Sequence, residues 1–571
     1  MNRLFLVFAI PAVLLLYGNA LEAPFILDDF AVNQAIPGWG SRPLGYTSFW
    51  LSQQVAYLFG AVFPFSAPFY FRIGNLLIHA LAATALFALT RALTSRTMVA
   101  AVAGIFFLVH PIQTQAVTYI TQRFESLATL FMLLAALSYV HFRKGHGWYW
   151  LAATVASAAA AGLTKETAVI LPVWLLLIEI VFFEGRSLVR RALYLAPLGL
   201  VIFYPAWRAF QSSAGTLTWV AWDRYFLTQG AVLTKYLMLS TWPEQQFLFY
   251  DFFIVESFTW TIAFQWTFVI GLIALGIFLV KRRPIVGFGI LTFFVLLLPV
   301  TLIPLPDLIF EHRIYPAFAG LAIAAAALCE VDKRKSVWLV VGALAVLWGF
   351  KTIQRNAEWN DEVTFLELHR ARFPQNPDIL MRLGSYYYVR GAVNKGIELT
   401  QEARRNEDRM NVYYRTMGKV LIAGNLTSLY LVKGDIEGAL AEARRAVALS
   451  PDQPFALTSL GSVMLKTGDY KGAAGVFRKM TEKDPANPQG WDGLRTALSK
   501  SGDEAGAEAA LKRYDEQVKS QNVVAADHAQ IPASYNIAVI FSLILLILGG
   551  GVFAVRTVLN AVTALRHPSN P

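Results

Sequence analysis

The sequence predicts an all-α protein in which a polytopic membrane helix bundle of about twelve spans is joined to an α-solenoid of helical repeats. Two observations predict the bundle. The 571-residue chain is 56% hydrophobic with a mean hydropathy of +0.48, and only 15% of its residues are charged, against about 25% in soluble domains. A third observation predicts the solenoid, because residues 353–530 alternate charged and apolar residues at helical spacing. We expect a membrane domain at 1–352, a repeat domain at 353–533, and a last membrane helix with a cytoplasmic tail at 534–571.

Apolar segments of sufficient length to cross a bilayer core of about 30 Å define the predicted spans. The first resembles a secretion signal, but no small-x-small cleavage motif follows it cleanly, so we expect an uncleaved helix. The predicted spans are 1–20, 71–93, 97–110, 115–140, 148–163, 167–183, 192–208, 263–280, 284–303, 313–330, 336–352 and 536–556.

Short basic loops between these spans set the predicted orientation. A cytoplasmic N-terminus places all of them inside, as the positive-inside rule requires; they contain Arg91/Arg96, Arg143/Lys144, Arg186/Arg190/Arg191, Lys281/Arg282/Arg283 and Lys333/Arg334/Lys335. The apolar stretch 226–240 would reverse every later loop if it were a span. We therefore interpret 209–262, which is rich in Trp and Tyr, as a non-cytoplasmic segment with a helix in the interface. Residues 21–70 and 353–535 then lie on the outer face.

The charge and cysteine content exclude little else. The formal net charge of +11 is explained by the topogenic loops, and no nucleic-acid-binding motif is present, so we expect no nucleic-acid partner. Cys329 is the single cysteine, which excludes an intrachain disulfide.

The C-terminal region repeats with a period of 34 residues. Gly434-Asp435, Gly468-Asp469 and Gly502-Asp503 coincide, as do Ala439, Ala473 and Ala507, and Pro451 and Pro485. This is the tetratricopeptide pattern of helix, turn and helix. A divergent repeat at 376–408 precedes it, followed by an insertion at 409–419 that breaks the period. The concave face of such a solenoid commonly binds peptides or extended partners; the alternative is a rigid spacer.

Ionisable and polar residues gather at the outer ends of the predicted spans, where charges are costly and by default indicate function. An acid there can take a proton from an acceptor hydroxyl as general base, and cations can neutralise a leaving phosphate. Sugar transfer from a lipid phosphate requires this combination. The residues are Asp28, Asp29, Arg42, Arg72, His79, His110, Gln113, Gln115, Arg123, Glu125, Lys165, Glu166, Glu311, His312 and Arg313.

A structural interpretation stays open for each group. The Asp28-Asp29 pair also suits a helix cap or a solvated turn, and the cations also suit pairing, as in Lys165 with Glu166 or Arg123 with Glu125. His79 and His110 have no His-x-x-x-His or cysteine spacing around them, so no metal site is predicted. A divalent ion stays an alternative that the sequence does not favour.

The ordered motifs resemble the transmembrane and tetratricopeptide-repeat O-mannosyltransferases and their bacterial relatives. The motifs are His110-Pro111-Ile112-Gln113-Thr114-Gln115 running on to Gln122-Arg123-Phe124-Glu125, together with Asp28-Asp29, Arg42-Pro43-Leu44, Asn75 to His79, Leu163-Thr164-Lys165-Glu166, Glu311-His312-Arg313 and Trp359-Asn360-Asp361. The resemblance runs from about Pro24 to about Lys519. It implies a GT-C fold that binds a polyprenyl-phosphate-linked sugar and transfers the sugar to Ser or Thr of secreted protein.

The same resemblance implies roles for single residues. The first acid of the outer loop serves as base in that fold, which indicates Asp28, with Asp29 as the neighbouring candidate. The donor phosphate and sugar are then expected to contact Arg42, Arg72, His79, His110, Arg123, Glu125, Lys165, Glu166, Glu311, His312 and Arg313. The sequence departs from the pattern of this family in two ways. Only about four repeats precede the last apolar segment, and Gln115 stands where the family has a second acid. The sugar, mannose or a bacterial sugar, stays open.

The resulting prediction is a membrane protein O-glycosyltransferase that works by inverting displacement. Its partners are a lipid-linked sugar as donor substrate, an exported acceptor protein bound by the repeats, and membrane lipid. The predicted location is a bacterial inner membrane, with repeats and active site on the periplasmic face. Two alternatives are a non-catalytic scaffold for envelope assembly, which needs only one or two spans, and a lipid-linked-sugar transporter, which predicts midplane charges and internal symmetry.

Overall fold

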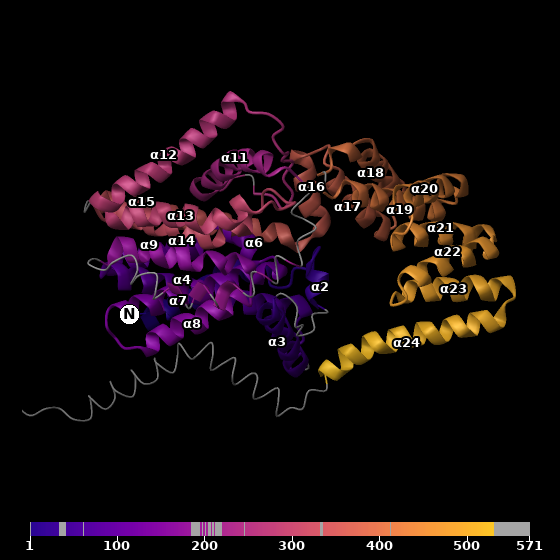
Figure 1. Ribbon diagram of the computed structural model, residues 1–571, viewed down its shortest axis with the longest axis horizontal. Helices are drawn as coiled ribbons and strands as arrows, with labels where there is room; N and C mark the ends of the chain where they lie inside the picture. The colour runs from indigo at the N-terminus through magenta and orange to yellow at the C-terminus, as the bar shows by residue number, and fades with distance from the viewer. Residues whose placement is uncertain are drawn as a thin grey trace, which may run out of the picture.

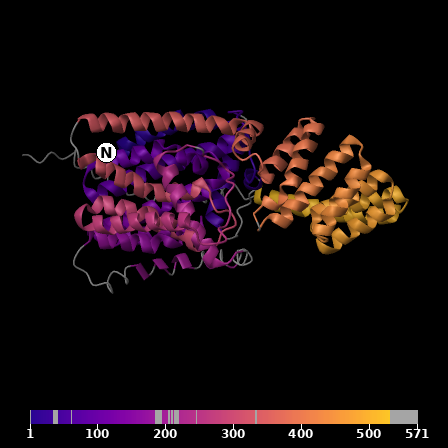
Figure 2. The same ribbon diagram turned by 90° about the horizontal axis from the view of Figure 1, so that it is seen from above.

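A computed structural model describes residues 2–33, 42–60, 62–183, 220–244, 246–331, 335–411 and 413–529, with scattered positions between 195 and 211. Within these ranges the chain is built of helices, without strands. Figure 1 shows a layered bundle on one side and an arc of helix pairs on the other, and Figure 2 shows the same separation from above. The predicted all-α combination of a membrane bundle and a helical-repeat solenoid is confirmed.

Among the described residues, ten helices of the bundle match predicted spans. Six are long and apolar enough to cross a membrane on their own, and a seventh would arise from α5 and the chain beyond Pro111, which turns by 54°. The predicted spans 192–208 and 536–556, and the segment 534–571, lie wholly or largely outside the described residues. The ten helices are α1 (Asn2–Tyr17), α4 (Ala67–Thr94), α5 (Thr97–Val109), α7 (Arg123–Arg143), α8 (Tyr149–Gly162), α9 (Leu171–Phe182), α12 (Trp260–Arg282), α13 (Pro284–Leu302), α14 (Ile314–Val331) and α15 (Lys335–Ala357).

The two ends of the bundle differ in chemistry. We call the end that faces the solenoid the repeat end and the opposite end the basic end. At the basic end Arg96 pairs with Glu330 across 2.7 Å, and Arg143 pairs with Glu179.

Helices α13 and α14 pack with their backbones in close approach: a Cβ added at Gly289 would lie 2.5 Å from the Gly320 carbonyl oxygen. Small residues at such crossings allow tight packing of apolar helices.

Helix α11 (Trp222–Thr241) covers the stretch that the topology excluded as a span. Trp222 Nε1 donates to the Leu302 carbonyl at 2.9 Å, and Tyr236 Oη, near its other end, accepts from Phe310 N at 3.2 Å. Leu302 ends α13 and Phe310 precedes α14, so both ends of α11 contact the repeat end. A helix is therefore present in the segment 209–262, and its position in the membrane interface stays a prediction.

The repeat end also carries the short elements that hold the outer loops. These are α2 (Asp29–Asn33), α3 (Pro43–Phe59), η2 (Pro111–Gln113), α6 (Thr114–Val117), η3 (Ile120–Gln122), η4 (Glu166–Ile170) and η6 (Glu311–Arg313).

The solenoid follows directly from the repeated Gly-Asp pair. Gly434, Gly468 and Gly502 end their helices with φ of 84°, 82° and 86°, in the left-handed region that glycine adopts without steric cost. The following Asp435 then caps the next helix, accepting from Gly438 N at 2.9 Å. The helices are α16 (Glu362–Arg372), α17 (Pro377–Val389), α18 (Val393–Arg405), α19 (Arg415–Lys433), α20 (Ile436–Leu449), α21 (Pro454–Thr467), α22 (Tyr470–Lys483), α23 (Pro488–Ser501) and α24 (Glu504–Ala529). In Figure 1 the last of them turns back towards the membrane domain.

Candidate functional site

A cavity of about 610 Å³ opens at the repeat end of the bundle; we call it the site cavity. One part of its wall is polar and the other apolar, which suits an amphiphilic ligand. The polar part consists of Asp28, Arg42, Thr121, Gln122, Glu125, Lys165, Glu166, Thr167, His312 and Arg313. The apolar part consists of Phe124, Val169, Phe203, Trp207, Pro299, Val300, Ile303, Leu305 and Phe310.

The two adjacent acids face different surroundings. Asp28 is exposed and lines the site cavity, and its backbone N–H donates to Tyr119 Oη at 3.2 Å. Asp29 is fully buried, and its Oδ1 accepts from Thr121 N at 2.8 Å and from Thr121 Oγ1 at 2.7 Å. Burial raises the pKa of Asp29 to about 6, although the hydrogen bonds from Thr121 oppose that rise. Asp29 therefore fixes the loop, and Asp28 is the acid available to a ligand.

Two cations of the site cavity are paired with carboxylates. Arg42 Nε donates to Glu166 Oε2 at 2.8 Å, and Lys165 Nζ lies 2.6 Å from Glu125 Oε2. Burial would raise the pKa of Glu166, but the charge and hydrogen bonds of Arg42 lower it below its usual value. The structure therefore pairs Lys165 with Glu125, where the sequence suggested Glu166.

Arg313 is held differently. Its Nη1 donates to the backbone carbonyls of Asp307 at 2.6 Å and Leu308 at 3.4 Å, and its guanidinium lies 5.2 Å from the Phe310 ring centre. Arg313 forms no ion pair with any described residue. Beside it, the Nδ1 of His312 lies 2.9 Å from Gln115 Oε1, which places Gln115 as an orienting partner. The positive charge of Arg313 is thus available to an anion.

Other predicted site residues lie outside the site cavity. Arg72 donates to the carbonyls of Leu21, Ala23 and Pro24 and so supports the chain leading to Asp28. Arg123 is fully enclosed and donates to Asn75 Oδ1 at 2.6 Å and to the Phe71 carbonyl at 2.5 Å.

Two predicted histidines are likewise packed inside the bundle. His79 lies between Tyr315 Oη at 2.8 Å and the Leu108 carbonyl at 3.2 Å. His110 Nδ1 accepts from Ile112 N at 3.2 Å. In the ranges that the structure describes, no group of three His, Cys, Asp or Glu side chains is placed to hold a metal.

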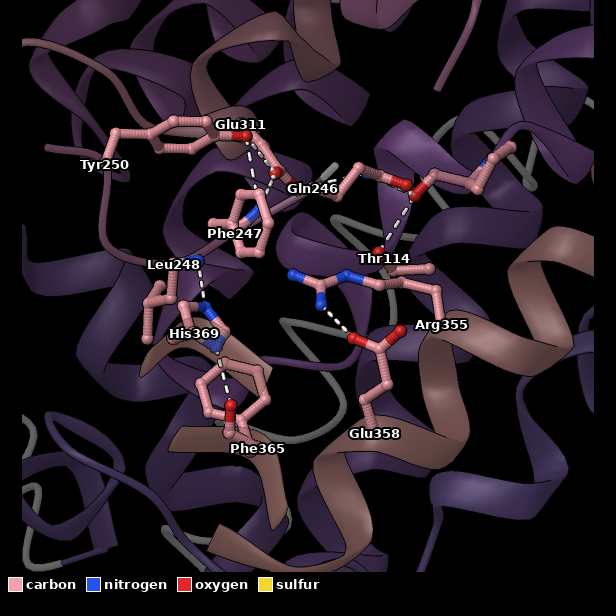
Figure 3. Close-up of polar contacts among 11 residues, drawn as sticks. Thr114, Gln246, Phe247, Leu248, Tyr250, Glu311, Arg355, Glu358, Phe365 and His369 are labelled. Atoms are coloured by element: carbon pink, nitrogen blue, oxygen red, sulfur yellow. Dashed lines mark hydrogen bonds and ion pairs between the residues drawn. The ribbon is translucent and has the colours of Figure 1, made fainter. Parts of the chain in front are cut away.

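Glu311 joins the bundle to the repeats (Figure 3). Its Oε1 accepts from Phe247 N at 2.6 Å and from Tyr250 Oη at 2.5 Å, while Oε2 accepts from the amide of Gln246 at 3.1 Å. The next residue of the same loop, Leu248, donates its N–H to Nε2 of His369 in α16 at 2.7 Å. Glu311 is thus an anchor for the loop that contacts the repeat domain.

His369 fits this junction only as a neutral imidazole. Its Nδ1 donates to the Phe365 carbonyl at 2.6 Å, which leaves Nε2 as the acceptor. Burial lowers the pKa of His369 to about 3, with the charge of Arg355 acting in the same direction. The junction therefore keeps its hydrogen bonds throughout the physiological pH range.

Thr121, Gln122 and Thr167 line the site cavity without having been predicted as site residues. Gln122 belongs to the motif that continues through Arg123, Phe124 and Glu125, and Thr121 adjoins it, so their position was a usable signal. Apart from Phe124 of that motif, the apolar wall had no signal, because its Phe, Trp and Leu side chains are of the same types that face lipid elsewhere.

Comparison with known proteins gives matches to both parts of the chain. Residues 43–208 match the family "Dolichyl-phosphate-mannose-protein mannosyltransferase", and residues 427–488 match "Tetratricopeptide repeat". Protein O-mannosyl-transferase Tmtc2 of Drosophila melanogaster is 34% identical over 27% of this chain and 19% of its own length. Tmtc1 of the same organism is 31% identical over 27% and 20%, and Xenopus laevis tmtc2 is 32% identical over 27% and 21%.

These matches span about a fifth of the length of the curated relatives. Among solved structures, MamA is 19% identical with a TM-score of 0.25, covering 30% of this chain and 95% of that chain. The peptide-binding tetratricopeptide protein YrrB is 14% identical with a TM-score of 0.21, covering 32% and 82%. In this chain a segment similar to a mannosyltransferase family therefore precedes a segment similar to tetratricopeptide repeats, and the first also resembles part of the Tmtc O-mannosyl-transferases.

Proposed function

We propose that this protein transfers a sugar from a polyprenyl-phosphate donor to Ser or Thr hydroxyls of an exported protein. The observation that carries the proposal is the site cavity, which combines one exposed carboxylate, three cations and an apolar wall. Its volume of about 610 Å³ is within the range of ligand pockets, roughly 300–1,000 Å³. A lipid phosphate joins an anionic head to an apolar chain, and this wall matches both.

In the proposed reaction, Asp28 accepts the proton of the acceptor hydroxyl. The hydroxyl oxygen forms a bond to the anomeric carbon while the bond from that carbon to the phosphate oxygen breaks, so the configuration inverts. The polyprenyl phosphate leaves with an additional negative charge. Arg313 stabilises that charge most directly, because no carboxylate of the described chain pairs with it, whereas the charges of Lys165 and Arg42 are compensated in part by Glu125 and Glu166.

The remaining predicted residues are assigned as positioning groups. Asp29 and Arg72 hold the loop that carries Asp28. Arg123 holds the start of α7, from which Glu125 reaches Lys165. Each acts by fixing a residue of the site cavity.

The repeat domain is the proposed acceptor-binding part. Stacked helix pairs form a curved surface that commonly binds extended polypeptide, and the arc in Figure 1 stands beside the repeat end. We place this face outside the cytoplasm, in the periplasm of a bacterium, since the basic loops of the described chain lie at the opposite end.

The test is intact mass spectrometry of exported proteins from cells with the wild-type gene, a deletion, Asp28→Asn or Asp223→Asn. The last is a matched control, because Asp223 is an exposed acid of α11 outside the site cavity. We expect a hexose- or pentose-sized mass to disappear in the deletion and in Asp28→Asn only. Unchanged masses with a folded Asp28→Asn protein would instead support a scaffold or a transporter.

A further inference from the structure

The insertion that breaks the repeat period docks on the membrane domain. We call residues 409–411, 413 and 414, between α18 and α19, the docking insertion. Arg409 Nη2 lies 2.9 Å from Asp251 Oδ2, Asn411 Nδ2 donates to the Pro306 carbonyl at 2.5 Å, and Tyr414 Oη donates to Asp307 Oδ2 at 2.9 Å. Met410 packs in the apolar core of the repeats, whereas Asn411 and Tyr414 direct their polar groups to the membrane domain.

The docking insertion contacts the segment 303–310, which connects α13 to η6. Phe310 of this segment lines the site cavity and also a second cavity of about 120 Å³, whose wall includes Asp307, Met410 and Tyr414. The segment is therefore the partition between the site cavity and the repeat domain.

The partition holds Arg313 in place. The guanidinium donates to the carbonyls of Asp307 and Leu308. The bonded groups are neutral carbonyls, so the geometry of Arg313 depends on the path of the Asp307 backbone. The Asp307 carboxylate interacts with the Arg313 charge through space, but no carboxylate of the described chain forms an ion pair with it.

That path depends on the repeat domain. Residues 304–309 make no main-chain hydrogen bond to another main-chain group within the described chain. Asn411 and Tyr414 hold Pro306 and Asp307 instead, through the two hydrogen bonds given above. Burial raises the pKa of Asp307, because removal from water disfavours its charged form. A hydrogen-bond donor such as the Tyr414 hydroxyl stabilises the charged form and so reduces this effect. An irregular segment without ladder hydrogen bonds takes its position from such side-chain contacts.

We propose that the docking insertion positions the donor-phosphate site: Tyr414, acting through Asp307, orients Arg313 towards a lipid phosphate in the site cavity. The proposal rests on the role of Arg313 in the proposed function. The repeats then have a second role besides acceptor binding. A bundle without the docked insertion would bind the donor weakly.

The test measures binding of farnesyl phosphate, a short lipid monophosphate, to the full detergent-solubilised chain, with farnesol as the probe lacking phosphate. We expect Tyr414→Phe to raise the Kd for farnesyl phosphate about fivefold to tenfold, as for loss of one typical hydrogen bond, and to leave farnesol binding unchanged. Tyr387→Phe is the matched control, since it removes a Tyr–carboxylate hydrogen bond of 3.1 Å to Glu367 inside the repeats. Asp307→Asn keeps an acceptor oxygen for Tyr414 and should bind nearly as wild type, whereas Asp307→Ala should not.

A double-mutant cycle separates positioning from general loosening. In an Arg313→Gln background, Tyr414→Phe should have no further effect on the Kd, because its effect passes through Arg313. The inference would be overturned if Tyr414→Phe raised the Kd equally in both backgrounds, or if its Kd equalled that of Tyr387→Phe. It would also be overturned if the wild type bound farnesol as tightly as farnesyl phosphate. Phosphate-dependent binding that responds to Tyr414→Phe, in a protein that transfers no sugar, would keep the inference and refute the proposed activity.

Discussion

Replacing each of the two adjacent acids by its amide separates catalysis from loop structure. Asp28 lines the site cavity with an exposed carboxylate, whereas Asp29 is buried against Thr121. Asp28→Asn removes the base while keeping the size of the side chain. Asp29→Asn keeps an oxygen that can accept both hydrogen bonds from Thr121.

The expected magnitudes differ widely. A general base contributes about 10²- to 10⁴-fold to rate, so Asp28→Asn should raise the activation barrier by about 3 to 5 kcal/mol. For Asp29, burial raises the pKa from 3.8 to about 6, so its negative charge costs roughly 3 kcal/mol at neutral pH. The amide removes that cost. It loses charge assistance in the hydrogen bonds from Thr121, the long contact from Ile26 N to Oδ2 at 3.5 Å and the attraction to Arg72. We expect kcat of Asp29→Asn within about fivefold of wild type.

The assay is transfer of labelled sugar from a polyprenyl-phosphate donor to a Ser/Thr peptide by purified protein, using the sugar that mass spectrometry of the exported acceptor identifies. Gel filtration and thermal unfolding establish that each variant is folded. Equal loss of kcat in both folded variants would refute the assignment of the base from exposure. A fully active Asp28→Asn would refute base catalysis by this loop.

Four further outcomes test other parts of the structure. Arg313→Gln should raise the donor KM by about tenfold to a hundredfold, as for loss of a charge-assisted contact, and Arg313→Lys should restore part of it, measured in the same assay. Glu311→Ala should lower the free energy of unfolding by about 3 kcal/mol or more, because three donors lose their buried acceptor; denaturation in detergent measures it, and a loss below about 1 kcal/mol would contradict the anchor role. Because the pKa of Asp29 is raised in the folded protein, this carboxyl group ionises at lower pH in the unfolded state. The wild type should therefore lose stability relative to Asp29→Asn as pH rises from about 4 to about 6, with no further change above. Melting temperatures of both proteins at pH 4.5 and 7 measure this difference. Gly289→Ala should destabilise α13–α14 packing by about 1 to 3 kcal/mol, since its Cβ would meet the Gly320 backbone, and an unchanged melting temperature would contradict that close approach.

Local patterns in the sequence determined the division into bundle and solenoid. Apolar runs predicted ten helices that the structure describes. Main-chain polar groups that face lipid must be hydrogen-bonded within the chain, and a helix satisfies them within one segment. The 34-residue period predicted the turns as well, because Gly434 ends one helix and Asp435 caps the next through contacts within four residues. Interactions between residues this close in sequence can be predicted without knowledge of the tertiary structure.

Contacts between distant residues decided which side chains form the site. The sequence offered Asp28 and Asp29 as near equals; Thr121, 92 residues beyond Asp29, takes one of them into the interior. Likewise nothing in the broken period predicted that Tyr414 would bond Asp307, 107 residues away.

Arg72 and Arg123 show the same limit. A buried guanidinium and a ligand-binding guanidinium look alike in sequence. They differ only in what occupies their donors, and here main-chain carbonyls from other loops occupy them. Composition and periodicity therefore set the architecture of this protein, while burial and partner identity, which arise only when separate segments pack, set the chemistry of its site.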